Sequence, residues 1–128
     1  MNTLITKDVK ISAETFFRPE YSQPTASKYV FSYQITIHNL GNTPVQLLRR
    51  HWFIFDSVGA KHEVEGEGVI GQQPILEPGE FHQYQSWSQL TTELGNMKGS
   101  YLMLDLKRNL QFQVWIPSFQ LIAPFKMN

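Results

Sequence analysis

The chain has 128 residues, enough for one domain with a single hydrophobic core. Eleven basic residues balance eleven acidic ones, which argues against a nucleic-acid partner, because phosphate binding usually requires a basic excess. The absence of cysteine excludes disulfides, thiol nucleophiles and zinc-thiolate sites.

The N-terminal sequence MNTLITKDVK lacks the basic segment and apolar run of a signal peptide. No stretch approaches the roughly 18 consecutive apolar residues that a membrane helix requires. A chain without cysteine also suits a reducing compartment. The sequence therefore predicts a cytoplasmic protein with no membrane partner.

The first half of the chain alternates between strand-like and turn-like segments. Residues 9–14 alternate apolar and polar side chains, as expected for a strand with one buried face. Residues 18–27, with two prolines, predict a loop. The clearest strand covers residues 29–38, where every second side chain is a large apolar one. The composition NLGNTP at residues 39–44 then predicts a turn.

Residues 45–55 are nearly continuously apolar and predict a long strand with an irregularity, such as a bulge, near Arg49 and Arg50. The later elements follow in chain order: a hairpin turn at 56–59, a return strand at 60–65, a turn at 75–80, a strand at 81–87, a polar loop at 88–98, a buried strand at 99–106, a turn at 107–109 and a strand at 111–116. Pro117 predicts a strand end or an edge strand.

The count is seven to eight short strands, with no helical stripe. The sequence therefore predicts an all-β fold over residues 1–128, namely an antiparallel β-sandwich of the immunoglobulin-like or fibronectin type III-like kind. A small barrel is the alternative architecture.

Gly66, Gly68 and Gly71 match the pattern G-x-G-x-x-G, which in dinucleotide-binding proteins lets a tight turn approach a pyrophosphate at a helix N-terminus. Here Pro74 follows three residues later and prevents a helix. The pattern therefore predicts a glycine-shaped loop or bulge between strands. A backbone-amide site for a phosphate-type anion, without a helix, is the alternative.

The four histidines, at positions 38, 51, 62 and 82, are too far apart in sequence to form a short metal-binding motif. A divalent cation site would have to assemble across strands, with carboxylates such as Asp56 and Glu63 as further ligands. The alternative is that these histidines are ordinary polar side chains on outer faces or turns. No nucleophile elbow or other catalytic pattern is present, so we expect neither enzymatic activity nor a cofactor.

Two further features point to surface recognition. Arg49 and Arg50 could bind a phosphate or an acidic partner, or they could form local salt bridges on a solvated face. Trp115 is predicted to lie opposite the buried face of its strand. If that opposite face is open, Trp115 is a candidate interface anchor; if another segment covers it, Trp115 belongs to the core.

Several longer motifs together resemble the ApaG domain family in its small, free-standing bacterial form. They are PVQLLRRHW at residues 44–52, the glycine series, GQQPILEPGE at 71–80, MKGSYLM at 97–103 and IPSF at 116–119. The resemblance covers nearly the whole chain. The residues that carry over to this family's motifs are Gly66, Gly68, Gly71 and the Arg50-His51-Trp52 element.

The resemblance implies a fibronectin type III-like sandwich, in agreement with the strand count. It also implies a link by name to cobalt resistance and magnesium efflux. In eukaryotes the domain is attached to an F-box protein and to a polymerase-delta-interacting protein, which implies protein–protein recognition. We therefore expect a non-enzymatic module that binds a protein partner. The alternative is a module that binds an anion or a divalent cation, and the sequence is compatible with a monomer or a homo-oligomer.

Overall fold

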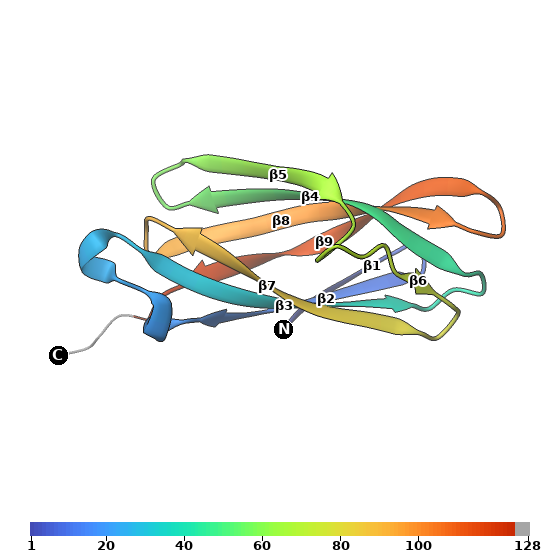
Figure 1. The fold of residues 1–128 in the computed structure, drawn as a ribbon, viewed down its shortest axis with the longest axis horizontal. Helices are drawn as coiled ribbons and strands as arrows, with labels where there is room; N and C mark the ends of the chain where they lie inside the picture. The colour runs from blue at the N-terminus through green and yellow to red at the C-terminus, as the bar shows by residue number, and fades with distance from the viewer. Residues whose placement is uncertain (125–128) are drawn as a thin grey trace.

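The computed structural model describes residues 1–124 and contains nine β-strands in two antiparallel sheets (Figure 1). The strands are β1 (Asn2–Thr6), β2 (Val9–Phe17), β3 (Tyr29–Asn39), β4 (Val45–Asp56), β5 (Lys61–Glu67), β6 (Ile75–Leu76), β7 (Phe81–Leu90), β8 (Leu94–Asp105) and β9 (Leu110–Ile122). Between β2 and β3 the chain forms two short 3-10 helices, at Pro19–Tyr21 and Pro24–Ala26, and an isolated β-bridge between Gln23 and Lys28. The predicted all-β sandwich is confirmed, with more strands than the seven to eight expected.

One sheet has the strand order β1-β2-β3-β7, and the other has the order β5-β4-β8-β9, with the short β6 added to β4. Figure 1 shows the two sheets stacked face to face, with β4, β5 and β8 in one layer and β2, β3 and β7 in the other. The hairpins β4–β5 and β8–β9 project at opposite ends of the molecule. None of the helical segments among residues 1–124 has the length and hydropathy needed to cross a membrane.

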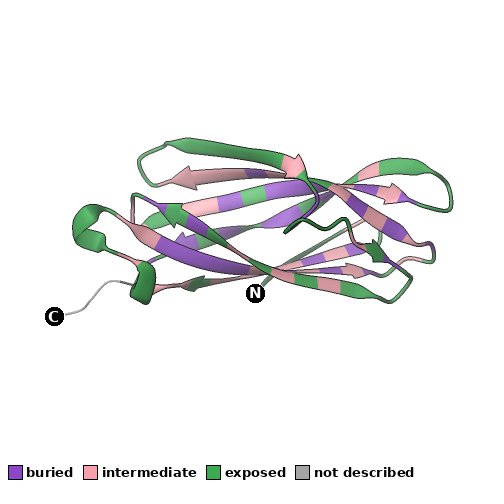
Figure 2. Ribbon diagram, in the orientation of Figure 1, coloured by how far each residue is buried: buried purple, intermediate pink, exposed green. Residues whose placement is uncertain are grey.

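Period-two alternation explains which faces meet in the core. On β3, the predicted apolar face is buried, and Ile35 and Ile37 are completely inaccessible to solvent. Figure 2 shows the same alternation of buried and exposed segments along the central strands, whereas β5 is almost entirely exposed. Burial of these facing rows supplies the main driving force for folding.

The irregularity predicted near the arginines is confirmed. The register of β4 against β8 shifts between Leu47 and Arg49, as a β-bulge produces. A second shift, between Met97 and Gly99, interrupts the pairing of β8 with β9. At Gly99 a Cβ atom would lie 2.2 Å from the carbonyl oxygen of His51, so only glycine permits this approach of β8 to β4.

The predicted loop at residues 88–98 is wrong. Strand β7 continues to Leu90 and β8 already begins at Leu94, so only three residues separate them. Gln89, Thr91 and Lys98 are exposed, while Ser88, Leu90 and Met97 are buried. Pairing with β3 and β9 therefore outweighs the low strand propensity of the composition.

Pro117 does not end its strand, because β9 runs through it to Ile122. Strand β9 is at the edge of its sheet, where the missing N–H of proline interrupts no ladder. Of the two predictions for Pro117, the edge strand is confirmed and the strand end is wrong.

Candidate binding surface

The glycine segment forms a tight hairpin turn. The N–H of Val69 donates to the carbonyl of Gln72 at 2.8 Å, and the N–H of Gln72 donates back at 3.0 Å. The two residues between them, Ile70 and Gly71, have φ angles of 48° and 72°, as in a type I′ turn. The structure therefore matches the prediction of a glycine-shaped turn between strands.

Three backbone amides of this segment are engaged in backbone hydrogen bonds. Besides the Val69–Gln72 pair, the N–H of Gly68 donates to the carbonyl of Leu48 at 2.9 Å. The carbonyls of Glu67 and Gly68 instead accept hydrogen bonds from Nη1 of Arg50, each at 3.0 Å. The segment thus turns carbonyl oxygens toward a cation, and backbone hydrogen bonds occupy the amides of Gly68, Val69 and Gln72, on which the anion alternative depends.

Arg50 lies on the same side of β4 as the buried Trp52, near the buried Tyr33 and Tyr101 and the half-buried Tyr84. The hydroxyls of Tyr84 and Tyr101 form a short hydrogen bond with each other. Burial raises the pKa of both, as it does for Tyr33, and the positive charge of Arg50 opposes this rise only partly. Arg50, which the sequence named as a binding candidate, thus links the glycine segment to the core by hydrogen bonds.

Trp52 is a core residue and not part of a binding surface. Only 3% of its surface is exposed, and its ring packs edge-on against Tyr33 at 5.3 Å and Phe119 at 5.8 Å between centroids. Its inclusion among the binding candidates is corrected by this burial.

His51, the residue before Trp52, points to the outer face of the same strand. Its Nε2 lies 2.7 Å from Oε2 of Glu63, and its Nδ1 lies 3.3 Å from Oε1 of Glu65. The register of β4 against β5 explains this cluster, because Glu65 is directly opposite His51 and Glu63 is two residues before Glu65 on β5, on the same face. One potential ligand atom from each residue lies within 4.8 Å of the others.

The other predicted metal ligands do not assemble with this cluster. Asp56 accepts hydrogen bonds from the N–H groups of Val58 and Ala60 and so stabilises its own turn. His38 is on β3, in the other sheet, and its Nε2 contacts the carbonyl of Gly79. Among residues 1–124, the His51 cluster is the one group with metal-ligand spacing.

The outer face of the five-stranded sheet also carries an aromatic hollow of about 520 Å³. Its lining consists of Phe53, Phe55, Lys61, Lys98, Gly99, Trp115, Ile116 and Ser118. Trp115 is 51% exposed, so the face opposite the buried row of β9 is open. We call this hollow, with these eight residues, the aromatic groove.

The two lysines of the aromatic groove lie against its phenyl rings. The Nζ atom of Lys61 is 5.5 Å from the centroid of Phe53, and that of Lys98 is 5.5 Å from the centroid of Phe55. These distances are typical of cation–π contacts. Beyond Phe53, the ring of His51 stacks at 4.4 Å, which joins the groove to the His51 cluster on one continuous face.

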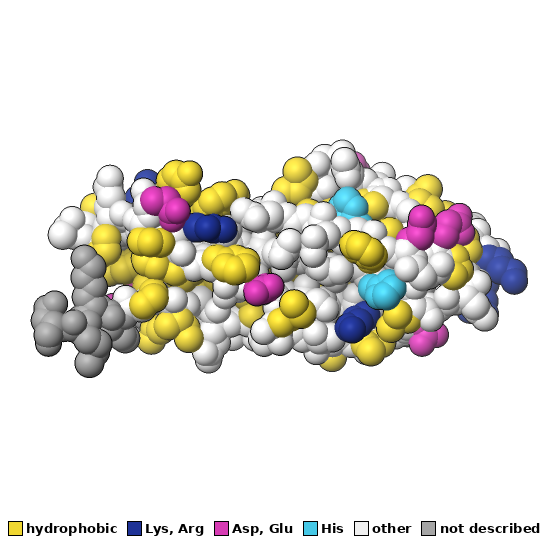
Figure 3. Space-filling model, turned by 90° about the horizontal axis from the view of Figure 1, so that it is seen from below, with side chains coloured by type: hydrophobic (Ala, Val, Ile, Leu, Met, Phe, Trp, Pro, Cys, Tyr) yellow, Lys and Arg dark blue, Asp and Glu magenta, His cyan; other side chains and the backbone are white. Residues whose placement is uncertain are grey.

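The opposite face of the molecule has a different character. Figure 3 views it from the side of the four-stranded sheet and shows hydrophobic side chains gathered around a basic one toward the left. Trp87 is 49% exposed there, but Tyr21 packs edge-on against it at 5.6 Å and Arg18 lies over it at 5.6 Å. Neighbouring side chains therefore already engage this tryptophan.

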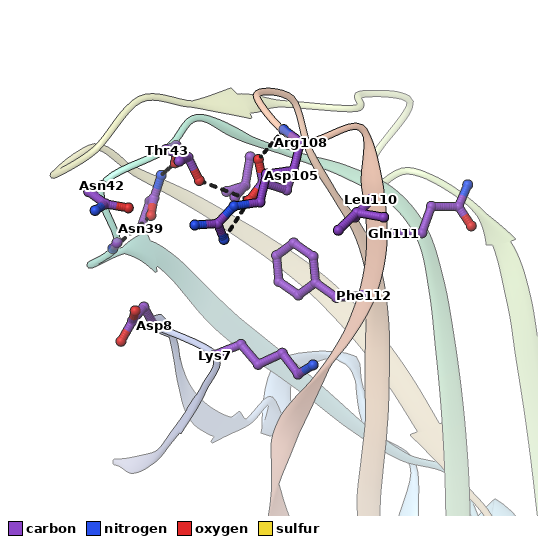
Figure 4. A pocket seen from close by; sticks show the side chains of 12 residues that line it. Lys7, Asp8, Asn39, Asn42, Thr43, Asp105, Arg108, Leu110, Gln111 and Phe112 are labelled. Carbon is purple, nitrogen blue, oxygen red and sulfur yellow. Dashed lines mark hydrogen bonds and ion pairs between the residues drawn. The ribbon is translucent and has the colours of Figure 1, made fainter.

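A second hollow, of about 230 Å³, lies at the end of the sandwich where the β1–β2, β3–β4 and β8–β9 turns meet (Figure 4). Its polar side chains serve the turns themselves. Asp105 accepts hydrogen bonds from Thr43 and from the N–H groups of Lys107 and Arg108. The side chain of Asn39 donates to the carbonyls of Thr43 and Leu76. These hydrogen bonds stabilise the turns, so we assign Asp105 and Asn39 a structural role.

The sequence predicted that Trp115 lies opposite the buried face of its strand and named His51 as a binding candidate, but it missed the other groove residues. Phe53 and Phe55 alternate with Trp52 and Ile54, so the two pairs face opposite ways. The alternation was hidden because all four are apolar. The structure shows that the phenylalanines are the outward pair, since they line the outer hollow, whereas Trp52 is buried and Ile54 packs against the core.

Comparisons with known proteins agree with this fold. A family model described as the ApaG domain matches residues 19–105. A protein named Protein ApaG from Pseudomonas syringae pv. tomato is 48% identical over 122 residues, which is 94% of each chain. A Protein ApaG from Anaeromyxobacter dehalogenans is 41% identical over 128 residues and covers both chains completely.

Solved structures give the same result. A crystal structure described as an ApaA protein from Bordetella pertussis is 39% identical and superposes with a TM-score of 0.89, covering 93% of this chain and 96% of that one.

Proposed function

The chain belongs to the ApaG domain family, and from this we propose that it is a non-enzymatic module that recognises a protein partner through the aromatic groove. The observation that carries the proposal is the exposed Trp115 beside two outward phenylalanines on an uncovered sheet face. Aromatic side chains of this kind dominate the binding energy of protein interfaces. The proposal places the module in the cytoplasm, which suits a chain without cysteine.

Two exposed tryptophans on opposite faces allow a matched test. Affinity capture from a lysate of the source organism would compare the wild type, Trp115→Ala and Trp87→Ala, with the retained proteins identified by mass spectrometry. We expect a protein retained by the wild type and by Trp87→Ala but lost with Trp115→Ala. Retention of the same proteins by Trp115→Ala, or loss caused by Trp87→Ala alone, would contradict the proposal.

A second candidate function is divalent cation binding by His51, Glu63 and Glu65. The close spacing of their potential ligand atoms favours it. One imidazole and two carboxylates suit Co²⁺ or Zn²⁺ better than Mg²⁺, which prefers oxygen ligands. The family link to cobalt resistance and magnesium efflux gives this candidate its biological interest. In the present geometry the two carboxylates engage different ring nitrogens, so an ion would require one glutamate to rotate.

NMR titration with Co²⁺ and Mg²⁺ tests this candidate. Binding predicts saturable paramagnetic broadening around His51 with Co²⁺, which is abolished in a Glu63→Gln/Glu65→Gln variant. His62→Gln, which alters an exposed neighbour on β5, is the control and should retain the effect. The cation candidate fails if the wild type shows no saturable change or if the double variant behaves like it.

A further inference from the structure

We propose that the aromatic groove binds an acidic segment of the partner, in which a large apolar side chain is flanked by carboxylates. This inference rests on the proposed function and specifies the chemistry of the partner. The apolar side chain would contact Trp115 and the two phenylalanines, and the carboxylates would pair with Lys61 and Lys98.

The floor of the groove provides the apolar half of this recognition. Phe53 and Phe55 are half-buried, and Trp115 rises beside them from β9. Gly99, at the irregularity of β8, also lines the groove and adds no side chain to it. An apolar side chain of the partner would bury its surface against three aromatic rings, an arrangement common at interface hot spots.

The charge of the groove provides the other half. Its lining contains two lysines and, among the described residues, no carboxylate. Neither lysine forms an ion pair within residues 1–124. Each ammonium group instead makes a cation–π contact with one of the phenyl rings. A partner carboxylate would give each ammonium group an opposite charge in a setting partly shielded from water, where Coulombic attraction is strengthened.

Glu63 lies on the same face of β5 as Lys61, two residues away, but its carboxylate contacts His51 instead. The His51 cluster therefore leaves Lys61 unpaired and places the carboxylates of Glu63 and Glu65 beside the groove. A partner carboxylate next to that cluster would be repelled, so the carboxylates that flank the apolar side chain should lie beside Lys61 and Lys98.

Binding on the face is favoured over addition of a strand at either edge. The edge of β9 is already contacted by β1, since Trp115 donates its N–H to Oγ1 of Thr6 and Asn2 donates to the carbonyl of Ser118. The other edge, β5, carries Glu63, Glu65 and Glu67, which repel an acidic segment.

A random peptide library displayed on phage tests the inference directly. Peptides selected on the wild-type protein would be sequenced, synthesised and measured by fluorescence anisotropy. The variants are Trp115→Ala, Lys61→Glu/Lys98→Glu and the control Lys10→Glu/Lys28→Glu, which changes the net charge equally on the other sheet and its loop. We expect selected peptides that combine a large apolar residue with Asp or Glu.

Affinity should fall roughly 30-fold with Trp115→Ala, as for an interface hot spot. Reversal of both groove lysines should cost about tenfold or more, while the control pair should leave affinity within about twofold. Added salt should weaken binding to the wild type.

The outcomes separate the two proposals. Peptides that depend on Trp115 but lack acidic residues, or that bind the lysine-reversal variant as tightly as the wild type, would overturn the acidic-segment inference and leave the recognition module standing. A selection that gives no binder dependent on Trp115 would overturn both.

Discussion

The guanidinium group of Arg50 occupies the space that a side chain at Gly66 would take. A Cβ atom at position 66 would lie 3.0 Å from both terminal nitrogens of Arg50. These residues are direct partners in the β4–β5 ladder, and Arg50 extends beyond Gly66 to donate to the carbonyls of Glu67 and Gly68. The glycine at position 66 is thus explained by the arginine opposite it, without any ligand.

The three glycines of the motif should differ in their tolerance of alanine. A Cβ at Gly68 would lie 2.3 Å from the carbonyl oxygen of Gln72, at a φ of 63°, so Gly68→Ala should cost about 3 kcal/mol or more. Gly71 has open space but a φ of 72°, which predicts about 1 kcal/mol. At Gly66 a flexible side chain can move, and the cost should be about 1 kcal/mol or less.

Urea unfolding of the three variants, measured by circular dichroism, checks this order. An anion-binding role of the motif would instead make all three substitutions alter ligand response at unchanged stability. An equal loss of unfolding free energy in Gly66→Ala and Gly68→Ala would also contradict the steric explanation.

Trp52 and Trp115 should differ in their contribution to stability, because one is in the core and the other is on the surface. Trp52→Ala should destabilise the fold by about 3–5 kcal/mol, because it leaves a cavity beside Tyr33 and Phe119. Trp115→Ala should cost about 1 kcal/mol or less, because half of that side chain is already in water. Thermal denaturation measures both, and a Trp115→Ala variant as unstable as Trp52→Ala would show that position 115 is structural.

Asp105 should contribute to the acid sensitivity of the fold. The N–H of Arg108 chiefly lowers the pKa of this carboxyl group, with help from Thr43, the N–H of Lys107 and the Arg108 charge, against the opposing effect of desolvation. Because the folded-state pKa is depressed, the ionised group stabilises the protein above its unfolded pKa of about 3.9. That contribution is lost as the pH falls through the folded-state value.

The corresponding experiment is urea unfolding of the wild type and of Asp105→Asn from neutral pH to about pH 2.5. We expect the variant to be less stable at neutral pH and to lose less stability in acid. Asp8→Asn, which alters another carboxylate of the same end hollow, is the control. Parallel pH profiles for the wild type and Asp105→Asn would contradict the assignment.

The buried tyrosines should make the fold sensitive to alkali. Burial raises the folded-state pKa values of Tyr33, Tyr84 and Tyr101, so their contribution to stability is full below the unfolded pKa of about 10. It is lost at higher pH, because the unfolded chain releases protons that the folded chain retains. Tyrosinate absorbance of this group should therefore rise in one steep step that coincides with loss of the circular dichroism signal.

Tyr84→Phe should reduce the amplitude of that step by one tyrosine. It should also destabilise the fold by about 1–3 kcal/mol, because the hydroxyl of Tyr101 loses its partner. Gradual ionisation before unfolding would show that solvent reaches these hydroxyls.

The sequence predicted the sandwich because β2, β3 and β9 each alternate apolar residues, which are buried, with polar residues, which are on average less buried. It failed where this contrast is missing. Strand β4 is apolar on both faces around Trp52, so its sequence alone does not say which aromatic rings point outward. The ends of β7 and β8 are polar, and only pairing with neighbouring strands makes them extended. The cluster at His51 depends on strand register, which a sequence does not state.

The contacts of β1 with β9 have a consequence for handling the protein. The side chains of Asn2 and Thr6 occupy backbone groups of β9 that would otherwise be exposed at the sheet edge. A chain shortened to begin at residue 9 would present β9 as an uncovered template for a second molecule. Such a truncated form should dimerise or form fibrils at concentrations where the full chain stays dispersed, and N-terminal trimming during purification is best avoided.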